Sequence, residues 1–104
     1  NIDEILSVPG LDGIFIGPYD LSMSLGIPGK LNHPDVVNAK KKVLKATLDK
    51  GLIAGIHCVH PDKSFLDCKD AIKDGYSFIA IGTDILFLGD SARKIYSDIK
   101  TKLL

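Results

Sequence analysis

Three times along this chain, a short apolar run is followed by a helix-forming segment, and this alternation limits the folds that the chain can adopt. The apolar runs contain isoleucine and end at glycine, proline or polar residues, as buried strands do. Short connections between alternating strands and helices produce parallel strands joined by right-handed crossovers. The sequence therefore predicts an α/β fold over residues 1–104, with strands near 13–17, 53–58 and 77–82 and helices near 34–50, 61–74 and 90–103.

Each predicted helix carries apolar residues at helical spacing, so each has one face to bury. These residues are Val36, Ala39, Val43 and Ala46 in the first helix, Phe65, Cys68 and Ile72 in the second, and Ala92, Ile95, Ile99 and Leu103 in the third. The first two helices begin with the tripeptides His33-Pro34-Asp35 and His60-Pro61-Asp62. Proline suits a first helical turn and aspartate suits the positive end of the helix dipole. We interpret both tripeptides as helix starts and not as a paired metal motif.

The first strand, Gly13–Gly17, is apolar enough to be buried on both faces. Three such strands make a poor sheet by themselves, because the outer strands keep unpaired edges. The chain either pairs with another copy or belongs to something larger. A (β/α)₈ barrel of ~250 residues devotes about ninety residues to three strand–helix units. The chain also begins at Asn1 and not at methionine, so we expect it to be the C-terminal three units of such a barrel, with its start missing.

Composition excludes some partners. The chain has 13 basic and 13 acidic residues, so no strong field attracts it to nucleic acid or to an anionic membrane. No apolar run has the length of a membrane span, and no leader peptide opens the chain. Two cysteines, Cys58 and Cys68, are too few for a disulfide scaffold, so we expect reduced thiols that fill apolar space in a cytoplasmic protein.

The chemistry of parallel α/β folds gathers where strands end. The first predicted strand ends at Gly17-Pro18-Tyr19-Asp20. A carboxylate there is either a ligand of Mg²⁺ or Mn²⁺, which prefer carboxylates and water, or a cap of a turn-helix beginning at Leu21. At the second strand end, His57 and Cys58 are adjacent on a strand and point to opposite faces, so a shared zinc ion is disfavoured. His57 instead lines a cleft, or is a histidine that is solvated or has its hydrogen bonds satisfied.

Other strand-end residues give weaker signals. Asp84 follows the third strand and caps the last helix or touches a substrate. Gly55 and Gly82 could let a phosphate approach backbone amides. The sequence contains no GxxxxGK[ST] phosphate loop and no serine–histidine–acid arrangement.

Four stretches together resemble one family. They are "GLDGIFIGPYDLSMSLGIPG", "NHPDVV", "AGIHCVHPD" and "GYSFIAIGTDILFLG", and they are similar to the C-terminal part of the HpcH/HpaI-type aldolases. These are class II, metal-dependent pyruvate aldolases such as the 2-dehydro-3-deoxyglucarate and 4-hydroxy-2-oxoheptanedioate aldolases. The GP-x-DLS element is the specific part, because it joins a strand end, a turn and an acid in one order. The resemblance covers essentially the whole chain.

The resemblance implies a (β/α)₈ barrel whose last three strands are those predicted above. It implies a carbon–carbon lyase that reversibly cleaves a 2-oxo-4-hydroxy acid to pyruvate and an aldehyde with a divalent ion, Mg²⁺, Mn²⁺ or Co²⁺. Asp20 would be one of two carboxylates that hold the ion, and the ion would act as a Lewis acid. The backbone around Tyr19 and Asp20 would receive the pyruvate carboxylate, and Gly17 and Pro18 would let the backbone turn close to the substrate. Homo-oligomers that exchange the last helix between subunits are also implied.

Two departures limit this transfer. The family's glutamate ligand, catalytic histidine and carboxylate-binding arginine lie upstream of the matched stretch and have no counterpart here. Glu4 lies on a connecting helix and Arg93 on the last one, so no catalytic residue is identifiable and the chain by itself is expected to be inactive. The second departure is His57, which stands where characterised members carry an apolar residue in the aldehyde pocket; it would favour a more polar aldehyde.

Two other functions fit the same residues. One is a non-catalytic half-barrel that dimerises through its open sheet edges and serves as a binding or scaffold module. The other is a barrel enzyme that seats a phosphorylated ligand at Gly55 and Gly82.

Overall fold

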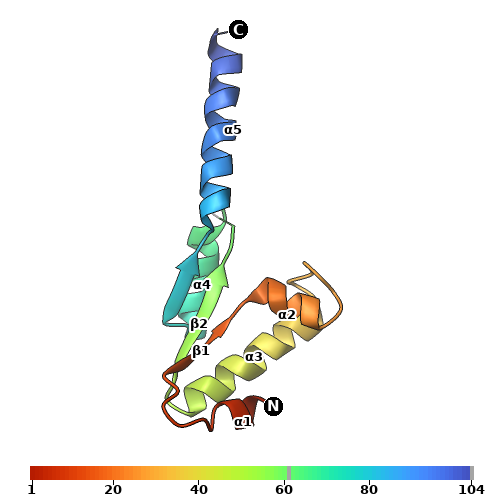
Figure 1. Ribbon diagram of the computed structural model, residues 1–104, viewed down its shortest axis with the longest axis vertical. Coiled ribbons are helices and arrows are strands. Elements are labelled where there is room, and N and C mark those ends of the chain that lie inside the picture. Colours follow the sequence, from red (N-terminus) through yellow and green to blue (C-terminus); the bar gives the residue numbers. More distant parts are fainter. Residues whose placement is uncertain (61, 104) are drawn as a thin grey trace.

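The computed structural model describes residues 1–60 and 62–103 and contains both strands and helices (Figure 1). In chain order its elements are α1 (Ile2–Ile5), β1 (Gly13–Ile16), α2 (Pro18–Ser24), α3 (Pro34–Asp49), β2 (Ile53–Cys58), α4 (Ser64–Asp74), β3 (Phe78–Ile81) and α5 (Asp84–Leu103). The class is α/β. None of the helices within the described residues is long and apolar enough to cross a membrane.

The three strands form one parallel sheet in the order β1-β2-β3. Ile16 of β1 is opposite Ile56 of β2, and Cys58 at the end of β2 is opposite Ile81 of β3. The carboxyl ends of all three strands therefore lie along one edge of the sheet. Residues that follow the strands meet at this edge, which is where the candidate site is found.

One face of the sheet is covered and the other is open. The covered face packs against α3 and α4 around a core that consists of Ile16, Ala54, Ile56, Cys58, Ala71 and Tyr76. On the opposite face, Phe15 and Phe78 remain 45% and 59% exposed, and their ring centroids lie 5.4 Å apart above Gly55. The expectation that the first strand is buried on both faces is wrong for this chain, because no helix within the described residues covers the Phe15 side.

Helix α3 buries the face that its spacing predicts. Val36 is fully buried, Val43 packs against the core, and Gly51 follows the helix with a positive φ of +70°. His33 is the N-cap, and its side chain accepts a hydrogen bond from the Asp35 backbone N–H. The first of the two tripeptides is therefore a helix start.

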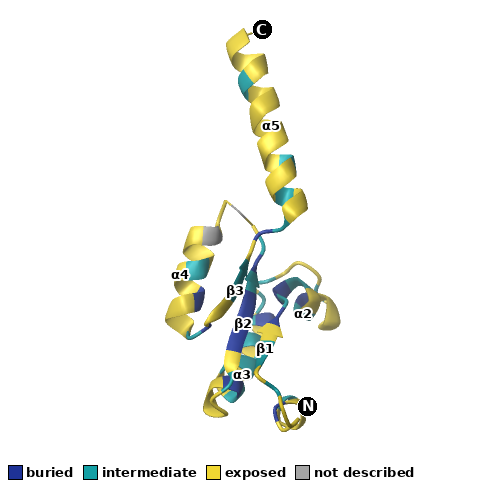
Figure 2. Cartoon of the chain, turned by 60° about the vertical axis from the view of Figure 1, so that its left-hand side comes forward, coloured by how far each residue is buried: buried dark blue, intermediate teal, exposed yellow. Residues whose placement is uncertain are grey.

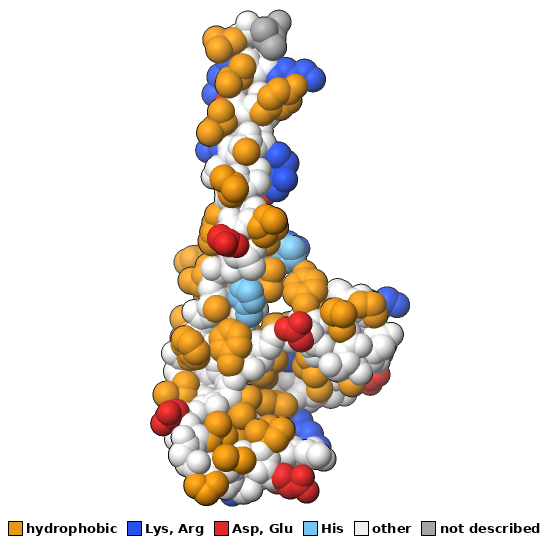
Figure 3. Space-filling view, in the orientation of Figure 1, with side chains coloured by type: hydrophobic (Ala, Val, Ile, Leu, Met, Phe, Trp, Pro, Cys, Tyr) orange, Lys and Arg blue, Asp and Glu red, His pale blue; other side chains and the backbone are white. Residues whose placement is uncertain are grey.

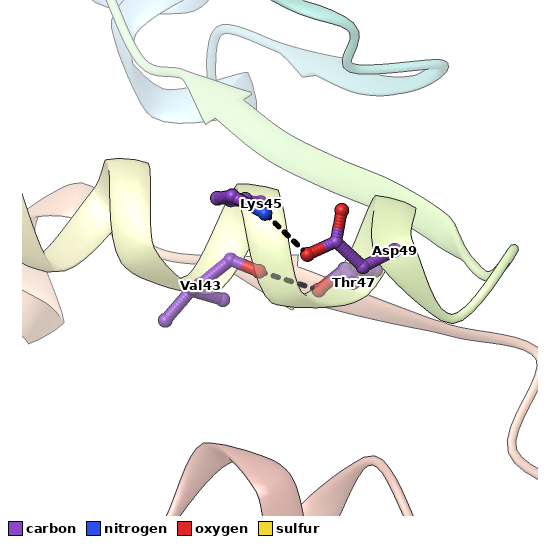
Figure 4. A network of polar contacts seen from close by, with 4 residues as sticks. All are labelled: Val43, Lys45, Thr47 and Asp49. Atoms are coloured by element: carbon purple, nitrogen blue, oxygen red, sulfur yellow. Dashed lines mark hydrogen bonds and ion pairs between the residues drawn. The ribbon is translucent and has the colours of Figure 1, made fainter.

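Two side-chain contacts support the last turns of α3 (Figure 4). The buried Thr47 hydroxyl donates to the Val43 carbonyl at 2.7 Å, so its polar group costs little inside the core. On the exposed side of the helix, Lys45 pairs with Asp49. An exposed pair of this spacing stabilises a helix by only about 0.3–0.5 kcal/mol.

Helix α4 differs from its prediction at its start and on its buried face. It begins at Ser64 with Lys63 as N-cap, so the second tripeptide is not the helix start; its Pro61 lies outside the described residues. Cys68 packs against the core, but Phe65 and Ile72 are 81% and 65% exposed. The buried residue of the helix is instead Ala71, because a small side chain lets α4 approach the sheet. Gly75 ends the helix with a left-handed φ of 111°.

Helix α5 extends away from the rest of the molecule (Figures 1 and 2). It contains no buried residue, and the Cα radius of gyration is 17.3 Å, against about 13 Å for a compact domain of this length. The helix starts at Asp84, six residues before the predicted start. The Asp84 carboxylate accepts from the Ile85 backbone N–H, which satisfies a helix donor that needs a partner, and Gly89 is tolerated inside the helix.

Candidate functional site

The corner between β1 and α2 carries four of the five residues that the sequence singles out. The chain leaves β1 at Ile16, Gly17 is the N-cap of α2, and Pro18 occupies its first turn. The Leu21 backbone N–H donates to the Gly17 carbonyl at 2.9 Å. A proline is suited to this place because the first N–H groups of a helix have no partner inside it. The turn-helix that the sequence places at Leu21 therefore begins three residues earlier, at Pro18.

Asp20 lies in the first turn of α2 and is exposed. It does not cap a helix beginning at Leu21, because the helix begins at Pro18 and its N-cap is Gly17. One oxygen of the Asp20 carboxylate folds back over Gly17 so closely that a Cβ atom at that position would overlap it. Glycine therefore allows the carboxylate to lie against the strand end.

A buried serine holds this corner in place. The Ser22 hydroxyl donates to the Tyr19 carbonyl at 2.7 Å and accepts from the Gly29 backbone N–H at 2.9 Å. Ser22 is completely buried, so both contacts are shielded from water and no polar group is left unpaired. The serine thereby connects α2 to the loop that precedes α3. Ser22 was not predicted as a site residue, although it is the third residue of the DLS motif that begins at Asp20.

His57 lies on β2 near its carboxyl end and reaches the neighbouring strand end. Its Nε2–H donates to the Gly82 carbonyl at 2.7 Å. A carbonyl oxygen can only accept, so Nε2 carries the proton, and in the neutral ring Nδ1 is a hydrogen-bond acceptor. Gly82 has a φ of +62°, and the Phe87 ring occupies the place where a Cβ atom would lie. Both features require glycine at the end of β3.

Tyr19 and His60 join the ends of β1 and β2. The Tyr19 hydroxyl lies 2.6 Å from Nε2 of His60, and the two rings meet edge to face with centroids 6.0 Å apart. This contact was not predicted, because the His60-Pro61-Asp62 tripeptide is typical of a helix start. The available signal was position, since both residues lie within three positions of the ends of neighbouring parallel strands.

A cleft of about 290 Å³ opens beside these residues. It brings together three of the predicted site residues, Pro18, Tyr19 and His57, and adds His60. Asp20 is not part of its lining. Among the described residues, no group of three or more histidine, cysteine or acidic side chains is placed to hold a metal ion. Asp20 is a suitable oxygen ligand for a hard cation, but it supplies only one carboxylate.

The covered face of β2 has its own electrostatic features. Burial raises the pKa of the Cys58 thiol to about 11, with the Cys68 thiol beside it as a second cause. Burial and then the Asp74 charge raise the pKa of Tyr76 to about 12. Both groups are therefore neutral near pH 7. Cys58 is buried in the core.

The surroundings of Gly55 do not fit the hypothesis that a phosphorylated ligand binds there. This glycine lies in the middle of β2, where an added Cβ atom would be 2.6 Å from the Phe15 ring and 3.1 Å from the Phe78 ring. Two aromatic side chains thus cover the backbone that a phosphate would have to approach.

Comparison with solved structures places this fold among aldolase-type proteins. The chain aligns with an HpcH/HpaI aldolase/citrate lyase family protein from Burkholderia cenocepacia J2315 at a TM-score of 0.84 and 30% identity, covering 95% of this chain and 37% of that one. An HpcH/HpaI aldolase from Desulfitobacterium hafniense DCB-2 aligns at a TM-score of 0.83 and 28% identity, covering 99% and 39%.

Sequence comparison identifies the family. Residues 1–89 match the HpcH/HpaI aldolase/citrate lyase family, and the chain belongs to it. The 2-keto-3-deoxy-L-rhamnonate aldolase of Escherichia coli (strain K12) is 38% identical over 91 residues, which are 88% of this chain and 33% of that protein. The chain thus spans about a third of the length of the curated relatives it matches.

Proposed function

We propose that this chain is part of a carbon–carbon lyase that reversibly cleaves a 2-oxo-4-hydroxy acid to pyruvate and an aldehyde. The observation that carries the proposal is the corner Gly17–Asp20, where an exposed carboxylate and the start of a helix lie at the carboxyl end of a parallel strand. This corner lies within the stretch that matches the family. The similar protein of E. coli is an aldolase for a 2-keto-3-deoxy sugar acid, which supports this substrate class.

The backbone of the corner suits the carboxylate of a 2-oxo acid. Pro18 has no N–H, and the N–H groups of Tyr19 and Asp20 belong to the first turn of α2, where helix donors lack partners within the helix. They would donate to the pyruvate carboxylate, and the Ser22 contacts would keep them in place. His57 would present Nδ1 as an acceptor toward a polar group of the aldehyde half.

Asp20 would hold a divalent ion, Mg²⁺, Mn²⁺ or Co²⁺, through its carboxylate. Such an ion acts as a Lewis acid toward the oxygens of a 2-oxo acid. The other ligands and the base would come from outside these 104 residues, since the described part of the chain offers no complete ligand set. The chain by itself would then be inactive.

The exposed helix α5 supports a proposal about assembly. Its apolar side chains, coloured orange along the projecting helix in Figure 3, include Ile85, Ile95 and Leu103, each at least 60% exposed. We expect this helix to pack on a second subunit, as an exchanged C-terminal helix in a cytoplasmic homo-oligomer. An assembly that forms without any aldolase activity would favour the scaffold function instead.

The experiment is to measure pyruvate release from 2-keto-3-deoxy-L-rhamnonate by the complete protein, with and without added Mg²⁺, Mn²⁺ or Co²⁺ after chelation. We expect chelation to abolish cleavage, and Asp20→Asn to lower kcat/KM by about 100-fold or more, the scale seen when a charge-stabilising group is removed. Asp35→Asn, another exposed first-turn aspartate, is the control and should cleave normally. Unchanged cleavage by Asp20→Ala would contradict the assignment of Asp20.

A further inference from the structure

The cleft at the strand ends continues on the covered face of the sheet, between α3 and α4. Core residues of that face form its floor, namely Ile56, Cys58, Ala71 and Tyr76. Its walls carry four charged side chains, Lys40 from α3 and Asp67, Asp70 and Asp74 from α4. None of these four takes part in the lyase chemistry proposed above.

A buried hydroxyl opens into this inner part of the cleft. Tyr76 is 5% exposed and lines the cleft, and its hydroxyl makes no hydrogen bond within the part of the chain that the structure describes. No polar side-chain atom among the described residues is both sealed from solvent and unpaired, so this hydroxyl reaches the cleft. As a neutral phenol it can donate to a ligand and accept from one. A ligand that supplies the missing partner at such a buried position gains a contact that water provides poorly.

Lys40 places a half-buried cation on the opposite wall. Among the described residues, no ion pair joins it to an acid of α4. Burial and the Cys68 thiol are the main causes that raise the pKa of Cys58, and after them the Asp67 charge raises it further while the Lys40 charge lowers it. Opposite charges from two helices thus act on one sulfur at the floor of the cleft without contacting each other. A half-buried ammonium group in this setting is suited to bind a carboxylate.

The acids of α4 form a row and not a compact cluster. Asp67, Asp70 and Asp74 have the spacing i, i+3, i+7, which places them on one face of the helix. They extend over two turns, about 10 Å along the helix axis. No group of three or more histidine, cysteine or acidic side chains among the described residues is placed to hold one metal ion. A row of this length suits a molecule with two separated cationic groups.

We propose that the inner cleft binds a cationic amino acid, a molecule that carries one carboxylate and two separate cationic groups. Its carboxylate pairs with Lys40 and accepts from the Tyr76 hydroxyl, and its two cationic groups lie along the acids of α4. The charge of the walls selects this class, because three acids and one lysine repel a net anion such as a sugar acid and attract a ligand of net positive charge. A simple diamine leaves Lys40 facing another cation. The volume of about 290 Å³ lies at the lower end of ligand pockets, about 300 Å³, which suits so small a molecule.

The test is calorimetric titration of the complete protein with L-lysine and with cadaverine, which is lysine without its carboxylate. We expect L-lysine to bind at least about tenfold more tightly than cadaverine, because a charge-assisted contact to Lys40 is lost in the diamine. Lys40→Met keeps most of the side-chain volume and should weaken L-lysine by about tenfold or more without weakening cadaverine. Asp67→Asn should weaken both ligands. Lys42→Met changes an exposed lysine of the same helix outside the cleft and is the matched control, which should bind both ligands as the unchanged protein does.

A second variant tests the buried hydroxyl. Tyr76→Phe keeps the ring that packs in the core and removes only the oxygen, and we expect it to weaken L-lysine severalfold while the circular dichroism spectrum stays unchanged. Absence of L-lysine binding at millimolar concentration would overturn the proposal, as would cadaverine binding as tightly as L-lysine. Full binding of L-lysine by both Lys40→Met and Tyr76→Phe would also overturn it. Binding is measured without an aldolase substrate, so its failure is distinguishable from failure of the proposed lyase activity.

Discussion

Helices α3 and α5 are both amphipathic, yet α3 buries its apolar face and α5 exposes its own. Val36 on α3 is fully buried and Val43 packs against the core, whereas Ile95 on α5 is 60% exposed. The difference lies in what the chain provides next to each helix. A sheet face lies beside α3, whereas α5 projects from the rest of the described chain and has no buried residue (Figure 2). An apolar stripe on a helix thus indicates that this face packs against something, but it does not indicate whether the partner is the same chain or another one.

The largest effect should come from deleting side-chain volume on the covered face. Ile56→Ala removes a core side chain that is 6% exposed, and we expect it to lower the free energy of unfolding by about 2–5 kcal/mol. The matched change on the uncovered helix, Ile95→Ala, should cost less than about 0.5 kcal/mol within one chain. Urea unfolding of both variants measures the contrast. Equal losses would mean that α5 is packed against the domain and that the comparison is wrong.

Alkaline pH tests the same covered face by titration. Burial raises the pKa of Cys58 from 9.0 to about 11, so the folded chain holds this proton more tightly than the unfolded chain does. The resulting stabilisation is complete below pH 9 and is lost as the pH rises to about 11, by on the order of 2–3 kcal/mol. Tyr76, raised from 10.0 to about 12 for the same main reason, extends the loss to higher pH.

The measurement is the free energy of unfolding by urea at intervals between pH 8 and pH 11, under reducing conditions. In Cys58→Ala we expect a lower stability at pH 8 but a smaller decline toward pH 11. The slope that remains in that variant is the part due to Tyr76 and other groups. A decline as steep as in the unchanged protein would show that Cys58 does not titrate in this window.

An intermediate effect is expected at the buried serine that supports the candidate site. Ser22→Ala leaves the Gly29 N–H without its acceptor, which should cost about 1–3 kcal/mol. Hydrogen exchange at Gly29 should become faster by a corresponding factor. Ser24→Ala changes an exposed serine of the same helix and should leave both quantities nearly unchanged. An effect confined to Ser24→Ala would contradict the role given to Ser22.

Features that depend on local sequence were predicted well, whereas features that depend on what covers a surface were predicted poorly. Parallel strands, the start of α3 at Pro34 and the glycine after it follow from local rules on periodicity and helix ends. The buried face of α4 was mispredicted because burial depends on what lies opposite, and here Ala71 and not Phe65 meets the sheet.

The candidate site shows a similar division. Asp20 and His57 could be singled out because strand ends are recognisable in a sequence, and their roles stay predictions. The Tyr19–His60 contact and the His57–Gly82 hydrogen bond join residues from different units, and their geometry depends on strand register. Register is set by side-chain packing across the sheet, so it could not be obtained from local patterns alone.

The smallest effect on the fold, and the sharpest test of the comparison, concerns the uncovered helix. In Ile95→Glu/Ile99→Glu, two exposed apolar residues of α5 become charged, and we expect the free energy of unfolding of one chain to change by less than about 0.5 kcal/mol. If the stripe packs on a second subunit, the same change buries two unpaired charges in that interface and should abolish assembly. Sedimentation velocity measures the oligomer, with Asp90→Asn on the same helix as the control. Assembly that survives the double substitution would show that another surface joins the subunits, and the exposed stripe of α5 would then need a different explanation.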